Sequence, residues 1–380
     1  QPLPSNAMVT VQLQKTTRPH YVVRNGDVSF QIPPYTGGPI SFTLNYYPAY
    51  IAQRDTYTVR AYISVDGRML YQYYPASGRE SRNNNMIRQW MASLCLSRLA
   101  VHSGEPAAAA LAERNIRFNL DNFYLNEHGL GLIEYDGKVK LGAVALAALA
   151  MLEHPHATRF TDYQRALVAT TDALWQSDGS FQTFYRPRHR SREPNLHNFY
   201  PGETLLMWAS LLATEDDPRR SERFARSVAY YRDWHLTNRK PSFIPWHTQA
   251  YYLRWQQQPD AQLAAWIFEM NDWLLHMQDN AMQVYDDTAG RFYNPAAEHL
   301  GYGPPHASST GVYLEGLIDA FALARDTGEA ARAEAYRVAI LRGLRSAMQL
   351  QFSDGPDSWF VADKPRVVGG LRTTVYNNVC

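Results

Sequence analysis

The chain has 380 residues, with 37 Lys and Arg against 36 Asp and Glu, and 45% of its residues are hydrophobic. This length and balance indicate one large folded domain, or a domain with a small module, and exclude a disordered tail or a coiled coil. The net charge of +1 argues against a nucleic-acid partner, and two cysteines exclude a disulfide scaffold or a cysteine-rich metal site. Aromatic residues make up 13% of the chain, which suits a sugar-binding groove.

Residues 1–80 are predicted to form a β-rich N-terminal segment. Runs rich in Val, Ile, Thr, Tyr and Phe are separated by Pro-Pro, Gly-Gly and Asn-Gly, which is typical of short strands. Because the chain opens with Gln1 rather than Met, we expect a signal peptide or an added sequence in front of it. We therefore leave residues 1–8 out of the fold assignment and favour a periplasmic or secreted protein, with a cytoplasmic one as the alternative. The expected strands are 9–13, 28–32, 40–46 and 57–64, the last forming a hairpin with 69–74 across Asp66-Gly67.

Residues 81–380 are predicted to be helical. The longest apolar run, residues 141–152, is much shorter than the roughly 20 residues that cross a bilayer, so no transmembrane segment is expected. Cys95 falls in an apolar helical run and is expected to be a buried free thiol. Apolar residues recur with helical spacing in 86–101, 106–120, 141–153, 163–175, 203–213, 219–234, 248–256, 261–277, 309–324 and 330–350.

These helices come in pairs. Short polar breaks at 103–105, 215–218, 257–260 and 326–328 divide each pair, and the pattern recurs about every 50–65 residues, as in stacked helical hairpins. Long segments remain at 124–139, 178–202 and 279–306. They fit loops on one rim of a closed ring better than an open solenoid.

Two local sequences resemble a known superfamily. The turn Asp178-Gly179-Ser180-Phe181 and the helix start Phe199-Tyr200-Pro201-Gly202-Glu203 are similar to those of the α/α-toroid proteins, over about residues 60–380. That superfamily includes the six-hairpin glycosidases, glucuronyl C5-epimerase catalytic domains and unsaturated uronyl hydrolases. The resemblance implies a mainly α, (α/α)6-type toroid with a small N-terminal β segment. It also implies catalytic carboxylates near the N-termini of the inner helices.

The expected number of inner helices falls short of six. Starts near residues 86, 140, 202, 247 and 308 account for five, and a sixth would begin after 372–378, where the chain stops. The N-terminal segment could complete the ring, or the ring could have a gap. We favour a toroid domain over 81–380 that is truncated at its C-terminus.

Acidic residues near the expected helix starts are the catalytic candidates. Glycoside cleavage needs two carboxylates, one protonated and one ionised. Glu203 opens a helix after Pro201-Gly202, where it could face the cavity or simply favour the helix dipole. Glu134 and Asp136 lie in a loop that Asp136-Gly137 turn chemistry also explains, and Glu315 lies beside Gly316 within an apolar helix. His247 follows Pro245-Trp246 at a helix start and could act as a base near neutral pH.

Basic and aromatic residues near these acids are the binding candidates. The basic loop 185–192 could hold uronate, sulfate or phosphate groups, or could simply be solvated. Lys138 and Lys140 precede the second inner helix. The predicted substrate-binding residues are Arg88, Gln89, Lys138, Arg186, Arg188, Arg190, Tyr185, Tyr200, Trp246, Tyr302 and Arg372.

Together these features predict a carbohydrate-active enzyme, glycoside hydrolase-like, that acts on an anionic poly- or oligosaccharide. The alternatives are a uronate C5-epimerase or polysaccharide lyase, and a non-catalytic glycan-binding or assembly scaffold. Phosphate-binding loops and dinucleotide fingerprints do not occur at strand-to-helix junctions, and the histidines lack metal-ligand spacing. We therefore expect neither a cofactor nor a metal.

Overall fold

The computed structural model describes residues 8–15, 18–31, 57–64, 67–191, 193–278, 289–292, 307–353, 355 and 358–373. The chain divides into two compact units. The first comprises residues 1–69, 92–122 and 153–157, and the second comprises 70–91, 123–152 and 158–380. None of the described helices is long and apolar enough to cross a membrane.

The first unit contains a three-stranded antiparallel sheet of order β2-β1-β3. Its strands are β1 (Met8–Lys15), β2 (Arg18–Gln31) and β3 (Tyr57–Ser64). The strands predicted at 9–13 and 57–64 are confirmed, whereas the one at 40–46 lies outside the described residues. The predicted hairpin between 57–64 and 69–74 is wrong, because β3 pairs with β1 instead.

The first unit also holds most of α1 (Met86–Ser103) and α2 (Pro106–Phe123). Buried polar side chains join them, since Ser93 Oγ donates to Asn115 Oδ1 (2.5 Å) and Asn119 Nδ2 donates to Ser93 Oγ (3.0 Å). Cys95 was expected in the core but is exposed. The physical reason is helical geometry, because Cys95 lies off the face that buries Trp90, Leu94 and Ser97.

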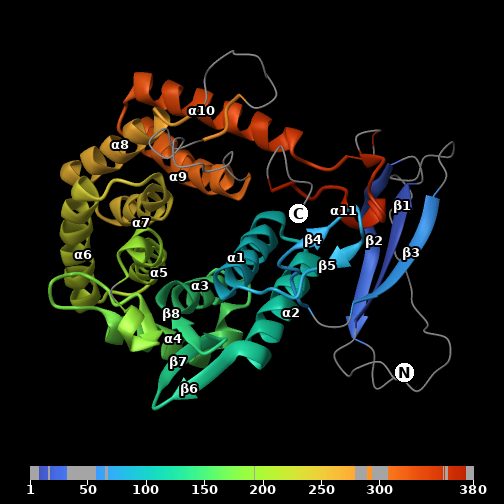
Figure 1. The fold of residues 1–380 in the computed structure, drawn as a ribbon, viewed down its shortest axis with the longest axis horizontal. Helices are drawn as coiled ribbons and strands as arrows, with labels where there is room; N and C mark the ends of the chain where they lie inside the picture. Colours follow the sequence, from blue (N-terminus) through green and yellow to red (C-terminus); the bar gives the residue numbers. More distant parts are fainter. Residues whose placement is uncertain are drawn as a thin grey trace. The chain divides into compact units, whose positions relative to one another are not determined.

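The second unit is built from helical hairpins (Figure 1). Helices α3, α5, α7 and α9 pack on one another in succession, and each is followed in sequence by an outer helix that packs against it. Nearly every residue of α3 and α5 is buried, whereas the outer helix α6 has an exposed polar face, as expected for inner and outer layers. The bounds are α3 (Leu141–Leu152), α4 (Thr161–Leu174), α5 (Tyr200–Leu212), α6 (Pro218–Thr237), α7 (Ile244–Gln257), α8 (Ala261–Leu275), α9 (Ala307–Asp326) and α10 (Ala330–Gln349).

The polar breaks that were predicted between paired helices are real helix boundaries. Asp217 caps α6 by accepting from the Arg220 amide (2.9 Å), and Asp260 caps α8 by accepting from the Leu263 amide (2.7 Å). Aspartate is among the best N-cap residues, because its side chain accepts from an amide that the helix leaves free. Local sequence therefore determines where the second helix of each of these two pairs begins.

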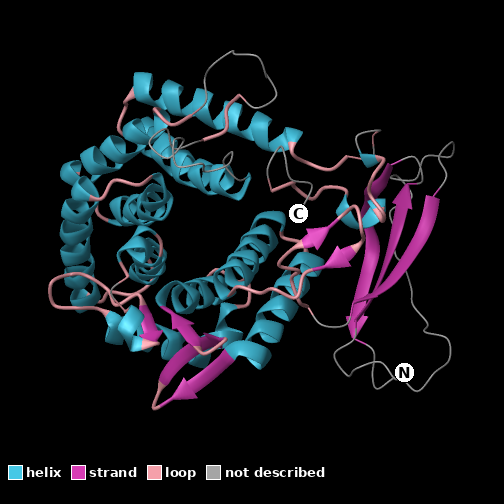
Figure 2. Cartoon of the chain, viewed as in Figure 1, coloured by secondary structure: helices cyan, strands magenta, loops and turns pink. Residues whose placement is uncertain are grey.

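The long loop expected over 124–139 is partly sheet (Figure 2). The positive φ angles of Asp136 (53°) and Gly137 (67°) form a two-residue hairpin turn, for which Asp-Gly is a preferred sequence. His128 and Gly129 form another such turn. The antiparallel sheet has the order β6 (Tyr124–Glu127), β7 (Leu130–Tyr135), β8 (Lys138–Lys140) and β9 (Phe184–Arg186).

The last described residues of the second unit pack on a hairpin that precedes α1. This hairpin is β4 (Tyr73–Tyr74) with β5 (Arg79–Glu80), and it shares a small core with Phe352, Val361 and Val367. The Ala362 amide donates to the Pro75 carbonyl (2.9 Å). The remaining short elements are α11 (Lys364–Val367) and the 3-10 helices Ala157–Phe160, Arg188–Arg190, Pro194–Asn198 and Pro241–Phe243.

Candidate functional site

Glu203 is a fully buried carboxyl group in the first turn of α5. The helix begins at Tyr200 with Pro201 in its first turn, three residues earlier than predicted. Glu203 is 1% exposed, and within the described part of the chain its Oε2 has no hydrogen-bond partner. Burial raises the pKa of Glu203 to about 8, against the opposing influence of the Arg88 and Lys140 charges. The carboxyl group is therefore mostly protonated at neutral pH.

The Glu203 carboxyl lies against the start of α3. A Cβ atom placed on Gly142 would overlap Glu203 Oε2 and come within 2.6 Å of Tyr200 Cδ1. Gly142 is thus the residue that lets the carboxyl approach the α3 backbone. Tyr200 is buried beside it and packs edge-on against Phe184, with ring centroids 6.4 Å apart.

Lys140 connects Glu203 to a neighbouring cleft. It ends β8, directly before α3, and burial lowers the pKa of its ammonium group, with further lowering by the Lys138 and Arg190 charges. The nearby carboxyl of Glu203 acts in the opposite direction. Arg88 is exposed in the first turn of α1 and is close enough to Glu203 to affect its pKa.

The cleft beside Lys140 has a volume of about 140 Å³. Ligand pockets usually measure roughly 300–1,000 Å³, so this cleft is sized for one part of a sugar rather than a whole oligosaccharide. Asn85 caps α1 by accepting from the Ile87 amide (3.0 Å), while Asn84 accepts from Gln89 Nε2 (2.9 Å). The lining residues are Asn84, Asn85, Met86, Ile133, Tyr135, Asp136, Lys138, Lys140 and Ala143.

The other predicted acids are already engaged. Glu134 pairs with Arg186 (2.9 Å), which also pairs with Glu127. Asp136 is exposed in its hairpin turn and bonds Lys138 (2.6 Å), which lowers the pKa of the Asp136 carboxyl. Glu134, Asp136 and Glu203 therefore occupy three different environments.

The basic loop is held by local contacts. Arg190 pairs with Glu193 and lies over the Phe184 ring, 4.7 Å from its centroid. Arg186 lies over the Tyr185 ring in the same way, at 5.7 Å. Arg188 is exposed. Of these arginines, Arg190 is the one that acts electrostatically on Lys140 and Tyr200.

His247 and Trp246 lie inside the first turn of α7, because this helix begins at Ile244. Both side chains are buried, and a Cβ atom on Gly202 would come within 2.6 Å of Trp246 Cβ and 2.9 Å of His247 Cδ2. His247 stacks on Phe243 with ring centroids 3.7 Å apart, and its Nδ1 is 2.7 Å from the Tyr251 hydroxyl. Burial lowers the pKa of His247 well below its usual value. These two residues lie in the contact between α5 and α7.

The remaining predicted residues are not among those that line the cleft, or lie outside the described chain. Gln89 is buried and bonds Asn84. Glu315 is half-buried in the middle of α9. Arg372 donates to the Gln349 carbonyl (3.0 Å), and Tyr302 lies outside the described residues.

Sequence reasoning identified Glu203 and Arg88 but gave Lys140 no role in the site. A lysine between a strand and an apolar helix resembles an ordinary flanking charge, and only the fold places it beside a buried carboxyl. Gly142 carried no signal either, because its importance depends on the neighbouring helix. In the part of the chain that the structure describes, no group of three or more His, Cys, Asp or Glu side chains is placed to hold a metal ion.

One protein family matches the sequence of the N-terminal part of the chain. Residues 1–77 match the family described as "Type III secretion system lipoprotein chaperone (YscW)". This match covers about a fifth of the chain. No curated protein matches the chain in sequence.

Comparison with solved structures gives a consistent fold. Cellobiose 2-epimerase from Bacillus thermoamylovorans B4167 is similar with a TM-score of 0.55 and 10% identity, over 75% of this chain and 81% of that one. D-mannose isomerase has a TM-score of 0.54 and 12% identity, over 81% and 87%. A family 76 glycoside hydrolase from a bovine Bacteroides thetaiotaomicron strain has a TM-score of 0.52 and 9% identity, over 91% and 85%. With the paired helices, these likenesses confirm the predicted mainly α, α/α-toroid class.

Proposed function

We propose that this chain is a carbohydrate-active enzyme that transfers a proton at a carbon atom of an anionic sugar, as an epimerase or lyase does. The observation that carries the proposal is Glu203, a buried carboxyl with a raised pKa that lies within electrostatic range of Arg88 and Lys140. The likeness to proteins named as an epimerase and an isomerase supports this choice.

The charge around Glu203 favours this chemistry over glycoside cleavage. Removing a proton next to a carboxylate or carbonyl builds negative charge on oxygen, which Arg88 would stabilise, together with Lys140 once it has taken up that proton. Glycoside cleavage instead passes through a positively charged, oxocarbenium-like state, which a neighbouring cation would disfavour. It also needs a second carboxylate that is free to reach the sugar, and Glu134 and Asp136 are each bound to a basic side chain.

The residues divide into three roles. Arg88, which is always charged, holds the sugar carboxylate. Lys140, whose pKa is lowered by burial, takes the proton from the sugar carbon as the base. Glu203 returns a proton as the acid. Return to the opposite face gives the epimer, whereas loss of the neighbouring glycosidic oxygen gives an unsaturated sugar.

The test is incubation with oligouronates in D2O, followed by proton NMR and ultraviolet absorbance. Epimerisation predicts deuterium at the carbon next to the carboxylate, with inverted configuration. Elimination leaves no hydrogen on that carbon and predicts the absorbance of an unsaturated uronate. Glu203→Gln should lower the rate about 10²–10⁴-fold, the usual contribution of a general acid. Glu222→Gln, which changes an exposed glutamate that pairs with Arg226 on α6, should leave the rate unchanged. Turnover with neither deuterium at that carbon nor the absorbance of an unsaturated uronate would contradict the proposal.

Glycoside hydrolysis is the second candidate, because a buried carboxyl with a raised pKa is also what a glycosidase uses as its acid. The likeness to a family 76 glycoside hydrolase supports it. New reducing ends, with neither deuterium at the ring carbon nor the absorbance of an unsaturated uronate, would identify this reaction in the same experiment.

A further inference from the structure

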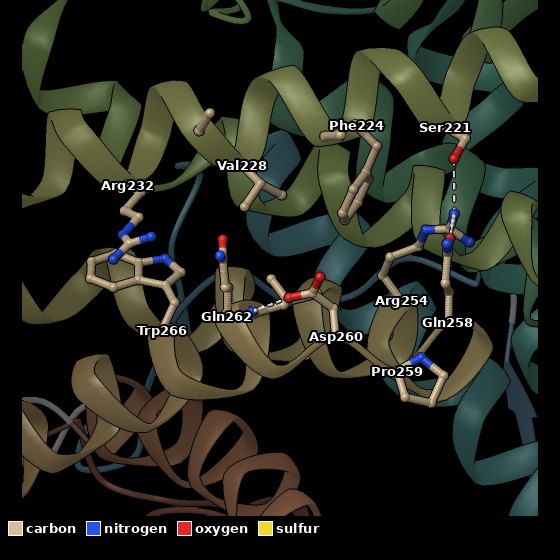
Figure 3. Close-up of a pocket in the computed structure, with 13 residues that line it drawn as sticks. Ser221, Phe224, Val228, Arg232, Arg254, Gln258, Pro259, Asp260, Gln262 and Trp266 are labelled. Atoms are coloured by element: carbon tan, nitrogen blue, oxygen red, sulfur yellow. Dashed lines mark hydrogen bonds between the residues drawn. The ribbon is translucent and has the colours of Figure 1, made fainter.

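A second hollow lies on the outer layer of the second unit, between α6 and α8 (Figure 3). Its volume is about 430 Å³, within the usual range for a ligand site and larger than the cleft at Lys140. We call it the α6–α8 groove. Its lining residues are Ser221, Phe224, Ala225, Val228, Ala229, Arg232, Arg254, Gln258, Pro259, Asp260, Gln262, Leu263 and Trp266.

One end of the groove is formed by Arg232 and Trp266 (Figure 3). The exposed guanidinium group of Arg232 lies over the Trp266 ring, 5.5 Å from its centroid. Within the described residues no ion pair involves Arg232, so its N–H groups are available to a ligand. Trp266 is 3% exposed, so a ligand at this end would meet the Arg232 guanidinium rather than the indole.

The opposite end is formed by Arg254, which is fixed in place. Arg254 donates to Ser221 Oγ (2.8 Å), to Gln258 Oε1 (2.9 Å) and to Gln257 Oε1 (2.9 Å). Among the residues that the structure describes, no carboxylate pairs with Arg254, so its charge is available at the groove. Because the side chain is already ordered by these contacts, binding there costs little conformational entropy.

The middle of the groove combines an apolar floor with amides. Phe224 and Val228 come from α6, while Gln262 and Asp260 come from α8 (Figure 3). Asp260 already accepts from the Leu263 amide as the N-cap of α8. The lining carries two arginines and one aspartate, so its net charge is positive. It therefore complements a negatively charged ligand.

We propose that the α6–α8 groove binds an anionic oligosaccharide as a site separate from Glu203. Carboxylates on the sugar chain would meet Arg232 and Arg254, and sugar hydroxyls would bond the Gln258 and Gln262 amides. The choice of a saccharide rests on the proposed function, whereas the negative charge and the acceptor-rich character follow from the groove itself. Such a site would hold a polymeric substrate on the enzyme while its reacting sugar lies at Glu203.

The test is hydrogen–deuterium exchange with tetragalacturonate, together with calorimetric titration. Tetragalacturonate should protect peptides within 221–232 and 258–266, whereas neutral cellotetraose should not. Ala225→Trp fills the groove from an exposed position and should abolish that protection. Arg232→Gln leaves the groove open but removes one positive charge. It should weaken the binding of tetragalacturonate at least tenfold, because a charge-assisted hydrogen bond is lost. Neither change touches Lys140 or Glu203, so protection of residues 140–143 and 199–203 should persist.

The outcomes separate this proposal from the proposed function. Protection of the groove peptides without protection near Glu203 would support the groove and count against the catalytic assignment. If tetragalacturonate does not protect the groove peptides, or if it protects them as strongly in Ala225→Trp and Arg232→Gln as in the wild type, the groove is not the binding site. Equal protection by hexaglutamate would overturn the saccharide as occupant and indicate an acidic peptide.

Discussion

Two buried residues, Glu203 and His235, have pKa values that burial shifts in opposite directions. Burial raises the pKa of Glu203 to about 8 and lowers the pKa of His235 to about 3. In both cases the cause is the same, since the neutral form is the one that a low-dielectric interior favours. Each shift makes a separate prediction about how stability depends on pH.

Glu203→Gln should stabilise the protein at alkaline pH. The native pKa of Glu203 lies above the value of 4.5 for the free group. The stability that its neutral form contributes is therefore complete below about pH 4.5, and it is lost as the pH rises through 8. At about 1.4 kcal/mol per pKa unit, the loss between pH 6 and pH 9 is on the order of 3 kcal/mol. Urea unfolding at pH 6 and pH 9 measures it. A variant that is equally destabilised at both values would contradict the burial of a neutral acid.

His235→Phe should stabilise the protein at acid pH. His235 stacks on Phe243 (4.2 Å between centroids), and both its ring nitrogens are buried without a partner. Its lowered pKa means that stability falls as pH decreases below about 6.5, by about 2 kcal/mol at pH 5. The melting temperature of the variant should therefore exceed that of the wild type more at pH 5 than at pH 8. His276→Phe, at an exposed position, serves as the control and should show no such difference.

Residue chemistry was predictable only where local sequence determines it. Glu203 was identified because it follows Pro201-Gly202 at a helix start. The burial that raises its pKa comes from residues far away in the chain, Gly142 among them, so sequence left its role open. The same holds for Trp246, which was expected in the groove and lies buried against Gly202.

At the scale of elements, the contact between α3 and α5 depends on Gly142. Gly142→Ala would place a methyl group where Glu203 Oε2 lies, so the carboxyl or the helix must move. Overpacking of this kind usually costs about 1–3 kcal/mol. We also expect a changed pKa of Glu203 and loss of turnover.

Gly311→Ala is the matched control for this prediction. Gly311 is also helical, in α9, and a Cβ atom there meets nothing within 4 Å. Alanine should therefore be neutral or stabilising by up to about 1 kcal/mol. Equal stability of the two variants, measured by urea unfolding, would show that Gly142 does not bring the helices together.

Helix pairing was the element-level feature that the sequence predicted well. Asp217 and Asp260 cap their helices by local hydrogen bonds, so their positions in the chain carry the information. The sheet over 124–140 was missed because its strands are short, although Asp136-Gly137 is a hairpin signal. The first turns of α5 and α7 were also missed, since proline in them resembles a loop.

At the scale of the second unit, residues 351–353 and 358–373 are anchored on the β4–β5 hairpin. Val361→Asp would place a charge in the small core with Tyr73 and Phe352, whereas Trp359→Asp changes a side chain that is 82% exposed. The first variant should speed amide exchange in residues 72–80 and 358–373, and the second should not. Equal exchange in both would mean that this core does not hold the segment.

The toroid class was predictable from the whole chain because it depends on a repeat rather than on any one residue. Helical spacing, polar breaks and their recurrence together indicated stacked hairpins, and the structural likenesses confirm the class. The site could not be predicted at this scale. It requires α3, α5 and the start of α1 to meet, which is a matter of tertiary packing.

The most direct test of the central claim is an infrared titration of Glu203, by difference between wild type and Glu203→Gln. Glu203 should show the carbonyl band of a protonated carboxylic acid at pH 6.5, and this band should disappear with a midpoint near pH 8. A band that is already absent at pH 6 would mean that Glu203 is ionised, and would contradict its assignment as the acid.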